Sequence, residues 1–198
     1  MFDSTRPITI NLRTPGGVKT VRVRFPSDEE WTERQRRRKV IIKQLGRGTS
    51  ETIVANSEDV DAALLAKIRE GDGPELDPFE AMKVMEQLSQ ADVDDVVPAG
   101  DSFRVVLRVL GGTTTHVLKM PSAKDVFDYR RGFARVLDLP YGRQELTINL
   151  GAARDLYKRL LETTEGYAGD APLIHQAVAA KAAIDALDAG FQETGDPN

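Results

Sequence analysis

The chain has 198 residues, 40% hydrophobic and 29% charged, which is typical of one globular domain or two small ones. It has no cysteine, so disulfides, thiol chemistry and thiolate metal sites are excluded. No apolar run approaches the roughly 20 residues of a membrane span, and the N-terminus lacks the apolar core of a signal peptide, so we expect a soluble cytosolic protein.

The net charge of −4 hides an uneven distribution of charged residues along the chain. Residues 1–50 hold 12 Lys and Arg against 5 Asp and Glu, and residues 51–101 hold 3 against 14. In residues 102–198 the two signs balance at 12 each. Two interpretations are open. The blocks neutralise each other within the fold or across a self-interface, or the basic block is kept for an anionic partner.

The first half of the chain predicts a β-hairpin followed by helices. Alternating apolar and polar residues predict two strands, and Pro15-Gly16-Gly17 between them is typical of a turn. Ser27 and Glu30 have the spacing of a capping box, which predicts a helix directly after the hairpin. In chain order, the expected elements are strands over 8–13 and 21–25, a helix over 28–45, a short strand over 52–54, and helices over 57–70 and 78–88.

The second half repeats this order after an acidic linker expected at 92–101. Leu107-Arg108, Gly111-Gly112 and Pro121-Ser122 are identical to the residues 95 positions earlier. The expected elements are strands over 103–109 and 116–120, a helix over 123–137, a short strand over 146–148, a helix that ends at Gly166, and a last helix from about Pro172 to Gly190.

Internal similarity at a constant offset is the signature of a repeated unit. The predicted fold class is therefore α+β, a tandem duplication of a β-hairpin–helix–(short strand)–helix–helix unit with pseudo-two-fold symmetry. The predicted repeats are residues 1–94, with a hairpin, a basic helix and two helices, and residues 95–198, with a hairpin, an apolar helix and two helices.

The two copies differ most on the helix that follows each hairpin. The second copy has Val126, Tyr129 and Phe133 where the first has an aromatic residue followed by two arginines. A run of cations cannot be buried on all sides, because an unpaired buried charge is costly. We therefore expect this helix to carry the partner-binding residues, which are Trp31, Arg34, Arg36, Arg37, Arg38 and Lys39.

Three interpretations of this basic helix are open. It is a solvated helix whose arginines pair with acidic residues of the same chain. It is an interface with another protein or subunit, because Trp and Arg are enriched among the residues that dominate such interfaces. Or it binds the phosphates of a nucleic acid.

The sequence contains no recognisable catalytic or metal-binding motif. His116 is expected on the return strand of the second hairpin, as a packed or rim residue, and His175 in the first turn of the last helix. Neither has a His, Cys or carboxylate at the spacing of a metal site. The adjacent carboxylates Glu58-Asp59 and Asp94-Asp95 point in different directions and form no ready acid–base pair. We therefore predict no catalytic residue, no metal, no cofactor and no enzymatic activity.

Two parts of the chain resemble proteins encoded in the tail region of tailed bacteriophages and prophages. The first comprises Leu156-Tyr157, Glu165-Gly166-Tyr167 and the stretch 172–178, and is similar to the C-terminal part of small tail assembly chaperone-like proteins. The second is the stretch 25–31 with the arginine run after it, which resembles phage structural-region proteins, so that the whole resembles tail assembly chaperone-like or minor virion proteins. The resemblance implies a morphogenesis or virion protein that is not an enzyme.

The leading hypothesis is a non-enzymatic phage-type structural or assembly protein that acts through protein–protein contacts, in tail morphogenesis or as a virion component. The expected partners are other phage structural proteins or further copies of the chain, without a membrane. The expected locations are the host cytoplasm during assembly or the virion. The competing hypothesis is a nucleic-acid-binding module that uses the basic helix at 31–39.

Overall fold

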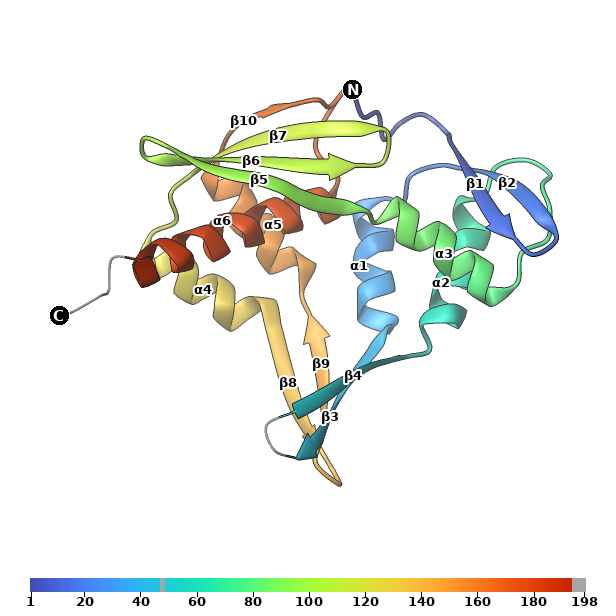
Figure 1. Cartoon of the computed structure of the whole chain (residues 1–198), viewed down its shortest axis with the longest axis horizontal. Coiled ribbons are helices and arrows are strands. Elements are labelled where there is room, and N and C mark those ends of the chain that lie inside the picture. Colours follow the sequence, from blue (N-terminus) through green and yellow to red (C-terminus); the bar gives the residue numbers. More distant parts are fainter. Residues whose placement is uncertain (47–48, 194–198) are drawn as a thin grey trace. The chain divides into compact units, whose positions relative to one another are not determined.

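The structure, a computed structural model, describes residues 1–46 and 49–193 and has a mixed α+β fold (Figure 1). Within these residues it contains six helices and three β-sheets, which confirms the predicted α+β class. The chain divides into two compact units, each built from segments that are far apart in the sequence. Unit 1 holds residues 1–3, 90–133 and the chain from Leu150 onward, and unit 2 holds residues 4–89 and 134–149.

Unit 2 combines two β-sheets with three helices. Its elements are β1 (Ile8–Thr14), β2 (Gly17–Val23), α1 (Asp28–Arg37), β3 (Lys39–Gly46), β4 (Thr49–Ala55), α2 (Ser57–Ile68), α3 (Pro78–Leu88), β8 (Ala134–Leu139) and β9 (Arg143–Ile148). Strands β1 and β2 form a separate hairpin, and the other four form an antiparallel sheet in the order β4-β3-β9-β8.

The core of unit 2 lies between the β1–β2 hairpin and the helices. Alternate residues of the hairpin, Ile10 and Leu12 on one strand and Val21 and Val23 on the other, are 0–3% exposed. Contacts of α3 with β1, α2 and α3 with each other, and α1 with α2 complete this core. The alternation that predicted the hairpin therefore reflects its buried face.

Unit 1 packs helices against an antiparallel sheet of order β10-β7-β6-β5. Its elements are β5 (Ala91–Ala99), β6 (Ser102–Val109), β7 (Gly112–Lys119), α4 (Ala123–Phe133), α5 (Leu150–Leu160), β10 (Leu161–Glu165) and α6 (Leu173–Glu193). Helix α6 contacts β5, β6 and β7, and α5 contacts α6 (Figure 1). Ala179, Ala180 and Ala183 on α6 are completely buried, and their small size allows the helix to approach its neighbours closely.

The first helix is shorter than predicted. It ends at Arg37 instead of Leu45, and residues 39–46 form β3. The side chain of Asn56 accepts a hydrogen bond from the Lys39 amide at 3.0 Å and donates one to the Arg37 carbonyl at 3.0 Å. These bonds take the place of the backbone hydrogen bonds that would continue the helix. The residues directly after Lys39 are β-branched, and such residues favour a strand.

The corresponding helix of the second half also ends early, at Phe133 instead of Leu137. The residues after it form β8, which pairs with β9 and joins the sheet of unit 2. The acidic linker predicted at 92–101 is largely strand β5, in which Asp94 forms an ion pair with Arg108 of β6. In these three places strand pairing decides the structure: β3 pairs with the distant β9, whereas β8 and β5 each pair with the next strand along the chain, β9 and β6.

The two halves of the chain share part of their order of elements, whereas β10, between α5 and α6, has no counterpart between α2 and α3. In the first half a hairpin precedes α1, a second hairpin and α2; in the second half a hairpin precedes α4, a second hairpin and α5. The predicted boundary between residues 94 and 95 lies within β5. The predicted repeats and their symmetry stay predictions.

Candidate protein interface on helix α1

The structure distributes the six predicted partner-binding residues over three environments. Four lie on α1, Arg38 is its C-cap, and Lys39 begins β3. Trp31 and Arg34 are buried, Arg38 is half-buried, and the remaining three are exposed. The basic run is therefore not a single surface.

Helix α1 begins where the sequence predicted. The Ser27 hydroxyl accepts a hydrogen bond from the Glu30 amide, and the Glu30 carboxylate accepts one from the Ser27 amide at 2.9 Å. Glu30 also forms a two-bond ion pair with Arg24 of the preceding segment, at 2.6 and 2.7 Å. These donors lower the pKa of Glu30 to about 2, with Arg24 as the largest cause. The capping box thus fixes the direction in which α1 leaves the hairpin.

Trp31 and Arg34 belong to the interior of unit 2. The Trp31 ring is 1% exposed and packs on Phe25, with ring centroids 5.8 Å apart. The Arg34 guanidinium lies 5.2 Å from the centroid of the Trp31 ring, within the range of a cation–π contact. It donates to both carboxylate oxygens of Asp61 on α2, at 2.6 and 3.0 Å, and Asp61 is completely buried. This buried ion pair ties α1 to α2.

Arg38 occupies an intermediate position at the end of α1. Burial lowers the pKa of its guanidinium, and the nearby Arg34 lowers it further, whereas Asp61 and Glu86 oppose the shift. Its Nε is buried and has no hydrogen-bond partner among the described residues.

Arg36, Arg37 and Lys39 are the exposed cations of the run. Arg36 forms an exposed ion pair with Glu33 one turn earlier, at 2.8 Å, and such pairs contribute little to stability. These three residues form the part of the predicted site that a partner can contact.

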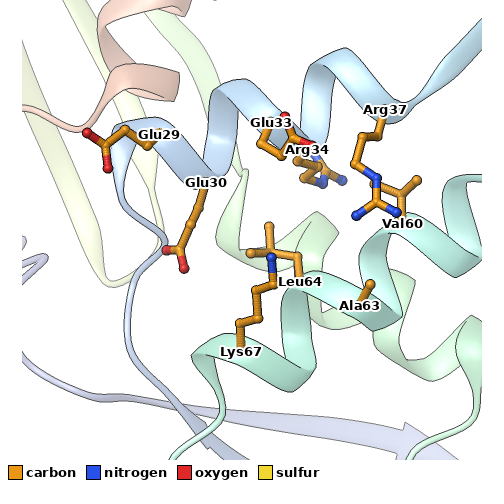
Figure 2. A pocket seen from close by; sticks show the side chains of 9 residues that line it. All are labelled: Glu29, Glu30, Glu33, Arg34, Arg37, Val60, Ala63, Leu64 and Lys67. Carbon is orange, nitrogen blue, oxygen red and sulfur yellow. The ribbon is translucent and has the colours of Figure 1, made fainter.

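A groove between α1 and α2 adjoins Arg37 (Figure 2). Helix α2 supplies an apolar floor, with Lys67 at one side, and Arg37 extends from α1 towards Val60 (Figure 2). The cavity volume is about 200 Å³. The residues that line the groove are Glu29, Glu30, Glu33, Arg34, Arg37, Val60, Ala63, Leu64 and Lys67.

The dimensions and polarity of this groove indicate what it can bind. Its volume is below the roughly 300–1,000 Å³ of typical small-molecule sites. It is large enough for one apolar side chain, and charges of both signs on the rim can pair with polar groups around that side chain. These properties are those of a protein contact with an apolar centre and a charged rim.

Unit 1 contains a second polar site, which we call the His–Tyr cluster: Thr114, His116, Tyr157, Tyr167 and His175. The Tyr157 hydroxyl lies 2.8 Å from Nδ1 of His116. The Tyr167 hydroxyl lies 3.1 Å from Nε2 of His116 and 3.1 Å from Nδ1 of His175. It also donates to Oγ1 of Thr114 at 3.0 Å.

One arrangement of protons satisfies all four contacts with neutral imidazoles. Tyr157 donates to Nδ1 of His116. The Nε2–H of His116 and the Nδ1–H of His175 then donate to the two lone pairs of Tyr167. Burial lowers the pKa of His116 to about 4 and that of His175 to about 3, the latter with a further contribution from His116. Both rings are therefore neutral at pH 7.

The His–Tyr cluster is enclosed by the core of unit 1. His116 is completely buried and His175 is 1% exposed. Phe2 lies against His175, with ring centroids 5.0 Å apart, and is itself 8% exposed. A substrate cannot reach the imidazole nitrogens in this arrangement, so the cluster is part of the buried core of unit 1.

Only part of this cluster was predictable from the sequence. The expectation of a packed or rim position for His116 is confirmed as a packed one. His116 lies on β7, two residues from both Thr114 and Leu118. Because side chains alternate along a strand, these three residues lie on the same face of the sheet. The partners on α5 and the segment before α6 follow from tertiary packing alone.

In the part of the chain that the structure describes, no group of three or more His, Cys, Asp or Glu side chains is arranged to hold a metal ion. No helix among these residues combines the length and apolar character needed to cross a membrane.

Comparisons with known proteins identify no relative of this chain. A scan against protein-family models, a search of curated proteins and a search of solved structures each found no match to this chain.

Proposed function

We propose that the chain is a non-enzymatic structural or assembly protein of phage type, which acts through protein–protein contacts in tail morphogenesis or as a virion component. The observation that carries the proposal is the groove between α1 and α2, with its apolar floor and charged rim. Arg37 lines the groove, and Arg36 and Lys39 are further exposed cations of the same run; polar residues are the usual rim of such a contact.

The competing function, nucleic-acid binding through the basic helix, has less support. Arg34 is engaged by Asp61, and Trp31 is inside the core, where it cannot stack on a base. Arg36 is paired with Glu33. Only part of the basic run is therefore available for phosphate contacts.

We also infer that the chain is a tandem duplication with pseudo-two-fold symmetry. The shared order of hairpin, helix, hairpin and helix in the two halves supports this inference. So do the corresponding helix starts, because Ser122 and Asp125 exchange the same hydrogen bonds as Ser27 and Glu30.

The proposed contact is tested by filling the groove without disturbing the core. Ala63 is exposed on α2 and lines the groove, whereas Ala66 is exposed on the same helix outside it. Ala63→Arg is expected to abolish co-elution of the chain with the products of the genes beside its own, when they are expressed together. Ala66→Arg, which adds the same side chain to the same helix, is expected to leave co-elution unchanged.

Two results would contradict the proposal. One is equal partner binding by the wild type and Ala63→Arg. The other is a shift of duplex DNA by the wild type at about 50 mM salt that weakens steeply as salt rises, because phosphate contacts have this signature. The Arg36→Glu and Arg37→Glu double variant is expected to weaken partner binding with the fold intact.

A further inference from the structure

The four-stranded sheet of unit 2 has two open edges that carry its most exposed apolar residues. The edge strands are β4 and β8, and β3 and β9 lie between them. Ile53 on β4 is 42% exposed, and Val136 and Leu137 on β8 are 51% and 55% exposed. Exposed apolar edge strands are sites at which another strand adds, unless they are blocked by charged side chains (lysine above all), proline or a bulge. Residues 51–55 and 134–139 contain no lysine and no proline, and their charged residues, Glu51, Arg135 and Asp138, lie on either side of the apolar pairs Ile53–Val54 and Val136–Leu137.

The exposed residues of the two edges lie in the same two rows across the sheet. On one face, Val54, Val40, Leu146 and Val136 are directly opposite one another in successive strands. On the other face, the row one residue along is Ile53, Ile41, Glu145 and Leu137. Each row therefore begins and ends with an apolar residue on an edge strand, and this residue has a neighbouring strand on one side only.

We propose that the sheet extends from one copy of the chain to the next, by antiparallel pairing of β8 with β4 of a second copy. In this register Val136 lies opposite Val54 and Leu137 opposite Ile53, so that both rows continue across the junction. Strand direction is consistent with the pairing, because β8 and β4 are antiparallel when the alternation of the sheet is extended by one strand. This contact is separate from the α1–α2 groove and does not depend on the proposed function.

The sheet already contains one contact of this kind. Strand β3, the first of its hairpin, pairs with β9, the second of the other hairpin. The proposed pairing joins β8, again a first strand, to β4, again a second strand. The contact between copies thus repeats the contact between the two hairpins of one copy.

A two-fold pairing of β8 with β8 of a second copy fits less well. A two-fold axis places one residue of β8 opposite the same residue of the second copy. For the pairing to be centred on β8, that residue is Val136 or Leu137. The first sets Arg135 opposite Leu137, and the second sets Asp138 opposite Val136. The proposed register sets Arg135 opposite Ala55 and Asp138 opposite Thr52, and only Leu139, at the strand end, meets a charged residue, Glu51.

The pairing has a consequence for assembly. Because β4 and β8 are different edges, each added copy presents a free β4 or β8 at the end of the growing array. Head-to-tail contacts of this type give a ring if the rotation closes and a filament if it does not. The partner that fits this surface is a further copy of the same chain.

The absence of native cysteine allows a direct test with introduced pairs in the full chain. Val54→Cys with Val136→Cys places two thiols on opposite edges, three strand spacings apart, or about 14 Å. This exceeds the roughly 7 Å limit between Cα atoms in a disulfide, so no bond forms within one copy. Oxidation is expected to give a ladder of multiples of 21.8 kDa on a non-reducing gel.

Matched variants separate this pairing from others. Ile53→Cys with Val136→Cys puts the thiols on opposite faces and is expected to give no ladder. Val136→Cys alone is expected to stay monomeric, and a disulfide-linked dimer would indicate the two-fold arrangement and overturn the proposal. A Val54→Cys/Val136→Cys chain that stays monomeric after oxidation would also overturn it.

A measurement without cross-linking completes the test. The sedimentation coefficient of the wild type is expected to rise with protein concentration, and that of Leu137→Lys to stay constant, because an edge lysine opposes strand addition. A wild-type coefficient that does not change with concentration would refute the pairing. Ala63→Arg is expected to keep the ladder of the cross-linking pair, so failure of the groove contact and failure of the sheet contact are distinguishable.

Discussion

Lowering the pH from 7 to 5 is expected to destabilise unit 1 through the His–Tyr cluster. The folded-state pKa values of His116 and His175, about 4 and about 3, lie below the ordinary value of 6.5. The unfolded chain therefore binds more protons than the folded chain between these limits, and stability falls as the pH falls through this window. The contribution of the two neutral histidines to the free energy of unfolding is fully present above pH 6.5 and is lost progressively towards pH 3.

The size of the effect follows from the two pKa shifts. At pH 5 an unfolded imidazole is almost fully protonated, whereas both folded imidazoles are still almost neutral. Each histidine then lowers the free energy of unfolding by about 2 kcal/mol relative to pH 7, and the pair by about 4 kcal/mol. Carboxylates with ordinary pKa values near 4 add little in this range.

The assay benefits from the fact that the chain has only two histidines, both in unit 1. NMR titration of the two imidazoles measures their pKa values in the folded chain, and urea unfolding at pH 7 and pH 5 measures the loss of stability. The fluorescence of Trp31, the single tryptophan, follows unit 2, which contains no histidine and provides the control. Imidazoles that titrate near 6.5 in the native protein would refute the reasoning.

Two further predictions concern single sites. Asp61→Asn leaves the buried guanidinium of Arg34 without its counter-charge and is expected to lower the free energy of unfolding by about 3–5 kcal/mol, whereas Asp61→Leu with Arg34→Met recovers most of it. Urea unfolding followed by tryptophan fluorescence checks this, and a loss near zero for Asp61→Asn would contradict it. Gly166→Ala is expected to destabilise unit 1 by more than Gly111→Ala. Both glycines have φ near +85 to +89°, but only at Gly166 would a Cβ meet a backbone oxygen, 2.8 Å away on Thr113. Equal losses in thermal melts would show that the close approach has no energetic consequence.

Elements defined by neighbouring residues were predictable. The hairpin at 8–23 followed from alternation and turn residues, and the start of α1 followed from Ser27 and Glu30. The start of α3 likewise follows from Asp77, which caps the helix in the same way. In each case the stabilising groups lie within a few residues of one another, so that the local pattern contains the physical cause.

Sites that depend on distant residues were not predictable. The basic run of α1 gave no indication that Arg34 turns inward, because its partner Asp61 lies on another helix, 27 residues away. The end of α1 depends on Asn56, which bonds to Arg37 and Lys39 from 17 to 19 residues away. Tertiary contacts alone therefore decide which cations of this short segment are exposed and which are buried.

The α+β class, the hairpins that follow from alternation and the capped helix starts can be read from the amino-acid sequence, since each depends on groups adjacent in the chain. The pairing of β3 with β9, across about a hundred residues, and the position of β4 and β8 at the edges of one sheet depend on tertiary packing. Strand pairing satisfies backbone hydrogen bonds irrespective of sequence distance, and burial selects which side chains face inward. For that reason the edges, the α1–α2 groove and the His–Tyr cluster, all built from distant segments, emerged only in the folded chain.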